Sequence, residues 1–171
     1  SIGNLINLRG LRLRSNNLTI LPPSIGLLTN LKYLTLTVNK LTTLPPEMFT
    51  LTNLIELSIS GNKLTTLPPS ISKLINLRKL NIIGNSLISL PSDIGLLTNL
   101  HILNLPYNKL TTLPPSIGLL TNLRKLDCHN NKLTTLPPEI SKLRNLDQLN
   151  LNKNNLPVDI YSLSIDQILK Y

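Results

Sequence analysis

Few residues in this 171-residue chain have the types and the spacing that catalysis requires. Asp127 and His129 lie two residues apart, and a carboxylate that orients an imidazole is half of a hydrolytic triad in which Ser60 or Thr37 could be the nucleophile. Successive side chains on one face of a strand are ~6.5 Å apart, which predicts no direct hydrogen bond between the two residues. No insertion in the sequence would build a pocket around them. We therefore predict that the chain is not an enzyme.

Metal and thiol chemistry have as little support. His101 and His129 have neither a second cysteine nor a cluster of carboxylates beside them in the sequence, so neither is predicted to bind a metal. Cys128 stands where the other copies of a repeated pattern carry Leu or Ile, which predicts a buried thiol that serves packing. One cysteine cannot form an internal disulfide, and this favours a reducing, cytoplasmic location. The sequence contains no Gly-rich phosphate loop, and we predict no cofactor.

A repeat of 23 residues organises the whole chain. Its frame L-x-x-L-x-L-x-x-N-x-L occupies positions 1 to 11, and L-P-x-x-I-x-x-L-x-N occupies positions 14 to 23. The frame recurs without insertion or deletion, with its asparagine at Asn16, Asn39, Asn62, Asn85, Asn108, Asn131 and Asn154. So strict a register indicates stacked equivalent units, because a slip of one residue would turn buried side chains outward. We predict a single domain over 1–171, with a partial repeat at 1–7, about seven repeats over 8–156 and a cap at 157–171.

Each repeat is predicted to contain one short strand and one short helical turn. Positions 4 and 6 are apolar and alternate with polar residues, which indicates a strand with one buried face. The strands must lie parallel because the chain always returns in the same direction. The asparagine at position 9 is predicted to bond backbone groups of its own and the neighbouring turn, forming a ladder of buried amides. In most repeats the Leu-Pro pair at positions 14 and 15 is followed by a second proline at position 16. This second proline can begin a helical segment, and about six residues are available for it, which predicts one or two turns of 3₁₀ or α-helix.

The two ends depart from the repeat. The segment 1–7 aligns with positions 17 to 23, and no amphipathic cap precedes it, so we expect a fragment or a chain that lacks its N-terminal part. After Asn154 the Leu-Pro-Pro block is lost. Ser164 and Gln167 form a candidate capping box, and Ile165, Ile168 and Leu169 have helical spacing, which predicts a C-terminal capping helix. No apolar run approaches the ~20 residues of a membrane span.

These two motifs resemble those of the leucine-rich repeat family over essentially the whole chain. The 23-residue form is similar to the Ras-group scaffolds of animals and plants and to tandem arrays in bacteria, protists and large DNA viruses. The resemblance implies a right-handed α/β repeat solenoid with a parallel β-sheet on its concave face, short 3₁₀ or α-helical turns on its convex face and a C-terminal capping helix. Family members bind proteins, nucleic acids, glycans and lipids, so the resemblance implies recognition without naming the ligand. The tail, with Pro157 and Asp159, also looks like the segment that precedes the GTPase domain in some Roco proteins.

The positions that vary between copies carry most of the information on binding. Positions 3, 5, 7 and 8 are predicted to point out of the strand face, whereas the Thr-Thr-Leu-Pro-Pro side repeats almost unchanged. The apolar residues expected to be exposed there are Tyr33, Val38, Ile83, Ile102, Pro106 and Tyr107. Exposed apolar clusters with polar rims often mark binding sites, and tyrosine is a favoured anchor. We predict that another protein binds this face through the anchors Tyr33, Ile83, Ile102 and Tyr107 and the polar residues Arg12, Arg14, Glu56, Lys79, Lys125, Asp127 and His129.

Two stripes of positive charge border the variable face. They consist of Arg9, Lys32, Arg78 and Arg124 at position 2 and of Lys40, Lys63, Lys109 and Lys132 at position 10. With a net charge of +9, the stripes either attract an acidic protein or a nucleic acid, or only keep the protein dissolved. The scarcity of aromatic side chains argues against nucleic acid as the ligand. Three alternatives to the protein-recognition module remain: a regulatory segment of a larger protein such as a Roco-type GTPase, a nucleic-acid or anion binder, and an array without a dedicated partner.

Overall fold

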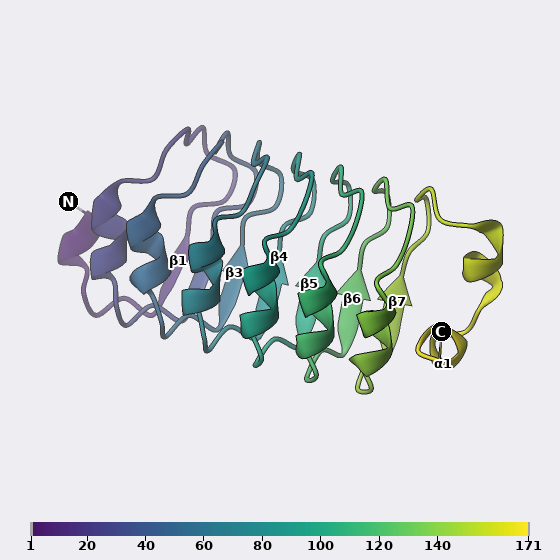
Figure 1. Cartoon of the computed structure of the whole chain (residues 1–171). Helices are drawn as coiled ribbons and strands as arrows, with labels where there is room; N and C mark the ends of the chain where they lie inside the picture. Colours follow the sequence, from purple (N-terminus) through teal and green to yellow (C-terminus); the bar gives the residue numbers. More distant parts are fainter. Residues whose placement is uncertain (1, 171) are drawn as a thin grey trace.

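The computed structural model describes residues 2–170, which form one coiled array of stacked turns (Figure 1). Each repeat contributes one three-residue strand from positions 3 to 5, and the seven strands form one parallel sheet in chain order. Neighbouring strands pair in register, so that Tyr33 lies beside Glu56 and Glu56 beside Lys79. The strands are β1 (Gly10–Arg12), β2 (Tyr33–Thr35), β3 (Glu56–Ser58), β4 (Lys79–Asn81), β5 (Ile102–Asn104), β6 (Lys125–Asp127) and β7 (Gln148–Asn150).

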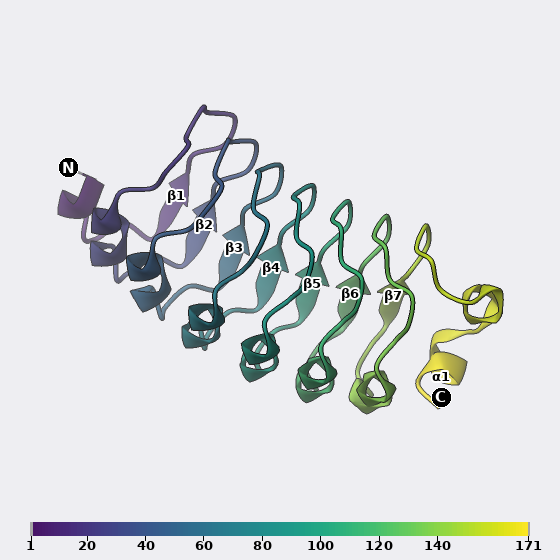
Figure 2. The ribbon, with the colours of Figure 1, turned by 45° about the horizontal axis from the view of Figure 1, so that its top comes forward.

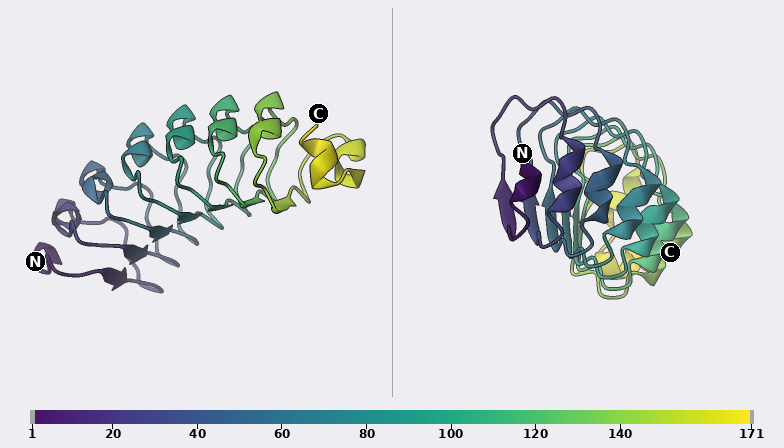
Figure 3. Two further views of the ribbon diagram at one scale, coloured as in Figure 1. Left: turned by 90° about the horizontal axis from the view of Figure 1, so that it is seen from below. Right: turned by 90° about the vertical axis from the view of Figure 1, so that its left-hand side faces the viewer.

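Short 3₁₀-helices form the opposite side of the array, as predicted (Figure 2). The prolines decide where they begin: Pro22 is extended, with φ −69° and ψ 144°, and Pro23 is the first helical residue, where a missing N–H is harmless. The segments are η1 (Ile2–Asn4), η2 (Pro23–Leu27), η3 (Pro46–Thr50), η4 (Pro69–Lys73), η5 (Ser92–Leu96), η6 (Pro115–Leu119) and η7 (Pro138–Lys142). The array bends gently, with the sheet on its concave side and the helices on its convex side (Figure 3).

A continuous apolar core fills the space between the sheet and the 3₁₀-helices. Most of the repeated Leu and Ile side chains are buried, as are Met48 and Phe49 in η3, whereas those of the first repeat, such as Leu11 and Leu13, are only partly buried. Cys128 is fully buried and takes the place of a position-6 leucine, as predicted. The pKa of its thiol is raised well above the ordinary value, first by burial and second by the negative charge of Asp127. The thiol therefore stays protonated and contributes packing.

The position-9 asparagines form the predicted ladder. The Asn62 amide donates to the carbonyl oxygens of Leu36 in the preceding repeat and Ile59 in its own, both at 3.0 Å. Its carbonyl oxygen accepts from the backbone N–H of Leu41, also at 3.0 Å. The same three bonds recur for Asn39, Asn85, Asn108, Asn131 and Asn154. Each asparagine thus satisfies backbone groups that the turn leaves unpaired.

A second asparagine ladder runs along the surface at position 23. The Asn53 amide donates to the carbonyl oxygen of Thr29, one repeat earlier, at 2.9 Å. Equivalent bonds are made by Asn30, Asn76, Asn99, Asn122 and Asn145. These exposed bonds tie neighbouring turns together where the chain returns from the 3₁₀-helix to the strand.

The C-terminal segment combines a 3₁₀-helix, η8 (Val158–Ser162), with one turn of α-helix, α1 (Ile165–Ile168). Both halves of the predicted capping box are present: the Gln167 N–H donates to Ser164 Oγ at 3.3 Å, and the Ser164 N–H donates to Gln167 Oε1 at 2.8 Å. The helix is shorter than the predicted cap over 157–171 because Leu163 is extended and separates the two pieces. Tyr171 lies outside the described residues. None of the helices formed by residues 2–170 is long and apolar enough to cross a membrane.

Candidate functional site

The predicted site residues lie on the concave face. Tyr33, Glu56, Lys79, Ile102 and Lys125 follow one another across β2 to β6 in a single row. Arg12 and Asp127 belong to the neighbouring row at position 5, where Arg12 is the first member and Asp127 the last but one before Asn150. Arg14, Ile83 and His129 occupy the row at position 7. The register therefore gathers these residues, which are distant in sequence, onto one surface.

The apolar part of this surface is narrower than the sequence predicted. Tyr33 and Tyr107 are 48% and 54% exposed, whereas Ile83 and Ile102 are half-buried. Pro106, which was expected to be exposed, is buried. Adjacent strands of the sheet are only ~4.8 Å apart, so the other residues of its row enclose the small proline ring.

Tyr107 and Val38 occupy a strained turn that the sequence did not predict. Their φ angles are 55° and 57°, in the left-handed region, where position 8 was expected to continue the outward face of the strand. Every position-8 residue shares this conformation: Ser15, Val38, Gly61, Gly84, Tyr107, Asn130 and Lys153. The turn is needed because the next residue, the ladder asparagine, must fold back onto the position-6 carbonyl. The conformation costs roughly 1–2 kcal/mol for a residue with a Cβ atom.

Asp127 and His129 are in direct contact. Asp127 Oδ1 lies 2.8 Å from His129 Nδ1 and also accepts from the His129 backbone N–H at 3.2 Å. The prediction that no direct hydrogen bond joins them was wrong, because β6 ends at Asp127 and the side chain caps the turn that follows. The Tyr107 ring meets the His129 ring edge-on, with centroids 5.0 Å apart. The Asn150 amide nitrogen lies 3.3 Å from His129 Nδ1.

This cluster has no nucleophile beside it. Ser60 lies three strands away from His129 in the same row, about 14 Å at the usual strand spacing. Cys128 is adjacent in sequence but buried, with its thiol protonated. No group of three or more potential metal ligands occurs within residues 2–170. The arrangement can present an oriented imidazole and a tyrosine ring to a ligand, which is recognition chemistry.

A polar hollow of about 110 Å³ lies in the N-terminal half of the same face. Four predicted site residues line it: Arg12, Tyr33, Glu56 and Lys79. The Lys79 ammonium stands 3.9 Å from Glu56 Oε2. Sequence reasoning missed the remaining polar lining, which comes from Thr35, Ser58 and Asn81. The feature of the sequence that could have indicated them is their place at position 5, in the same row as Arg12.

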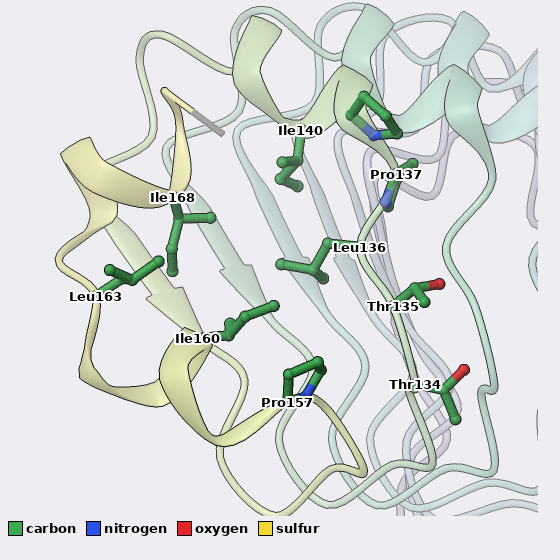
Figure 4. Close-up of a pocket in the computed structure, with 10 residues that line it drawn as sticks. Thr134, Thr135, Leu136, Pro137, Ile140, Pro157, Ile160, Leu163 and Ile168 are labelled. Atoms are coloured by element: carbon green, nitrogen blue, oxygen red, sulfur yellow. The ribbon is translucent and has the colours of Figure 1, made fainter.

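A larger, apolar pocket of about 250 Å³ opens between the last full repeat and the C-terminal segment (Figure 4). One wall comes from Leu136, Pro137 and Ile140, and the other from Ile160 and Ile168. The pocket exists because the chain leaves the repeat after Asn154, so no further Leu-Pro-Pro block packs against the last one. The loss of the Leu-Pro-Pro block after Asn154 is the feature of the sequence that could have indicated this pocket.

Comparisons with known proteins agree with this architecture. A family model described as a leucine-rich repeat region matches residues 1–89 and 69–162. A leucine-rich repeat protein of Leptospira interrogans is 33% identical with a TM-score of 0.78, and the internalin InlF of Listeria monocytogenes is 30% identical with a TM-score of 0.82. In both cases the match covers 96% of this chain and 48% of the solved chain, so this chain spans about half their length.

A plant protein is also similar. The plant peptide hormone receptor RGFR1, solved in complex with RGF2, is 27% identical with a TM-score of 0.72, over 91% of this chain and 30% of the receptor chain. Comparison with curated proteins found no match to the sequence. The repeat frame, the asparagine ladder and the matching family model together establish that this chain belongs to the leucine-rich repeat family.

Proposed function

We propose that this domain is a non-enzymatic recognition module that binds another protein on its concave face. The observation that carries the proposal is the contrast between two surfaces of one stack. The ladders and the Leu-Pro-Pro side repeat almost unchanged, whereas Tyr33, Ile83, Ile102 and Tyr107 differ from the residues at the same positions in other repeats. A surface that varies from repeat to repeat can specify a partner, whereas a constant one mainly specifies the stack.

The anchors of the proposed surface are Tyr107 and Ile102. Tyr107 is more than half exposed, and its ring is held by the contact with His129, so binding would cost little side-chain entropy. Lys125, Asp127 and His129 surround these anchors and supply polar groups. The plant peptide hormone receptor, which was solved in complex with RGF2, supports a binding role for such arrays.

The test compares two pairs of substitutions in a pull-down from the source organism. The variant with Tyr107→Ala and Ile102→Ala should lose the captured protein while its melting temperature stays close to that of the unchanged domain. The matched control replaces Leu96 and Leu119 with Ala, because these exposed leucines lie on the convex side. Equal capture by all three proteins would refute the concave anchors.

The alternatives differ in what they predict. A regulatory segment of a larger protein, such as a Roco-type GTPase, requires a GTPase domain encoded downstream in the same reading frame. A nucleic-acid binder that uses the basic stripes would release RNA steeply as salt rises. We propose the cytoplasm as the compartment, because the one cysteine is buried and reduced.

A further inference from the structure

The polar hollow on the concave face is rich in hydrogen-bond donors that have no partner. Within residues 2–170, the Arg12 guanidinium makes no hydrogen bond or ion pair, and neither does the Thr35 hydroxyl. Asn81 accepts from Asn104 through its carbonyl oxygen, which leaves its N–H groups free. Ser58 shares a hydrogen bond of 2.9 Å with Thr37. Such a set of donors fits a ligand atom that accepts hydrogen bonds.

The charges that line the hollow favour an anionic ligand. Glu56 is the one carboxylate in the lining, and Lys79 stands 3.9 Å from it, so the two charges offset each other. The Arg12 charge at the other side of the hollow has no counterpart. A carboxylate between Arg12 and Lys79 would meet two cations and the Thr35 and Asn81 donors. Charge-assisted hydrogen bonds of this kind are the strong ones.

The residues that surround the hollow are also positively charged. The position-2 stripe and the position-10 stripe are exposed and border the sheet on both sides. Among the described residues, Lys79 is the one lysine or arginine with a carboxylate within 4.0 Å. The positive charge along the stripes is therefore not neutralised within the domain, and it would draw an acidic ligand toward the face.

The scarcity of aromatic side chains favours a polypeptide over a nucleic acid as the acidic ligand. Aromatic residues make up 3% of the chain, and within residues 2–170 Tyr33 is the one aromatic residue that lines the hollow. Single-stranded nucleic acids are generally bound by stacking their bases on aromatic rings, whereas a carboxylate of a polypeptide needs only the cations and the hydrogen-bond donors that are present.

We infer that the concave face recognises an acidic polypeptide segment and seats one of its carboxylates in the hollow between Arg12 and Lys79. The inference rests on the proposed function and names the chemistry of the partner. Arg12 lies on β1, and Tyr107 follows β5 by three residues. Four strand spacings, or about 19 Å, therefore separate them across the sheet, and an extended segment of roughly six residues spans that distance. The segment thus carries a carboxylate at one end and an apolar group for Tyr107 and Ile102 at the other.

A random peptide library displayed on phage tests the inference and does not require the partner to be identified first. Peptides selected on the immobilised domain should be enriched in Asp and Glu. Their affinity should fall about tenfold in each of Arg12→Met and Lys79→Met, because each loses a hydrogen-bonded charge. Glu56→Gln should raise affinity, since it removes the repelling carboxylate. The control Lys73→Met removes an equal charge from the convex side and should change affinity little. Thermal melts of each variant exclude unfolding.

The outcomes distinguish this inference from the proposed function. Two results would overturn this inference: selected peptides that are not enriched in Asp and Glu, or equal losses of affinity in Arg12→Met, Lys79→Met and Lys73→Met. The proposed function would survive either result if the same peptides fail to bind the variant with Tyr107→Ala and Ile102→Ala. Peptides that bind that variant as tightly, or no enrichment at all, would count against both proposals. A competition experiment tests nucleic acid as the ligand. If a single-stranded RNA displaces the selected peptides at a lower concentration than a free acidic peptide does, the inference is overturned in favour of nucleic acid.

Discussion

His129 is held by Asp127 through two contacts to one oxygen: Asp127 Oδ1 lies 2.8 Å from the ring Nδ1 and 3.2 Å from the backbone nitrogen. Asn150 makes the same backbone contact one repeat later, accepting from the Asn152 N–H at 3.3 Å. In the sixth and seventh repeats the position-5 side chain thus closes the turn that ends the strand. In the sixth repeat it also orients an imidazole, against which Tyr107 packs.

Asp127→Ala is expected to lower the free energy of unfolding by about 1 kcal/mol or somewhat more, because it leaves the His129 N–H without an acceptor. Asp127→Asn keeps an oxygen at the same place and should cost clearly less. Urea denaturation followed by circular dichroism measures both. Equal losses for the two substitutions would show that the carboxylate charge matters more than the turn closure.

Asn85→Leu should destabilise the domain by on the order of 1–3 kcal/mol, because it leaves the Leu64 N–H inside the stack without its acceptor and removes one of the two amide bonds to the Ile59 carbonyl. The control is Asn16→Leu at the first turn. Asn16 is exposed, and its amide bonds only Leu13 and Arg14 of its own turn. Denaturation midpoints should therefore shift much less for Asn16→Leu, and comparable shifts would contradict the role given to the ladder.

Gly95→Ala is expected to destabilise the stack by about 1–3 kcal/mol through overpacking. An added Cβ would stand 2.8 Å from the Ser116 Cβ and closer still to the Ser116 carbonyl oxygen, a backbone atom of the neighbouring repeat that cannot turn away. Gly10→Ala is the matched control, because its Cβ would meet nothing nearer than the Tyr33 Cβ at 3.9 Å. The measurement is the melting temperature of both variants. No difference between them would mean that neighbouring 3₁₀-helices can separate at little cost.

Val38→Asn should stabilise the domain by about 1 kcal/mol, because asparagine tolerates the left-handed conformation that a β-branched residue resists. Asn130 already occupies the equivalent position 8 of a later repeat, with a φ of 55°. The control Val158→Asn changes an exposed valine that does not have a positive φ. A differential melt compares the two, and a loss of stability in Val38→Asn would show that the exposed valine side chain makes contacts that outweigh the strain.

The sequence alone determined the architecture. A period of 23 residues without a slip, an asparagine at position 9 and a Leu-Pro pair at position 14 each restrict the backbone locally, and only stacked parallel strands satisfy all of them at once. The same reasoning located the capping box of Ser164 and Gln167, because a cap depends on residues three apart. Local and periodic signals of this kind are readable without knowing any distance between repeats.

The tertiary structure alone decided how the variable residues meet. Asp127 reaches His129 because the strand ends between them, Pro106 is buried because its row is crowded, and Tyr107 stands in a strained turn because the next asparagine must fold back. The free donors around Arg12 follow from register across four strands. These relations depend on side-chain direction and on neighbours 23 residues or more away, which a pattern of residue types along one chain does not encode.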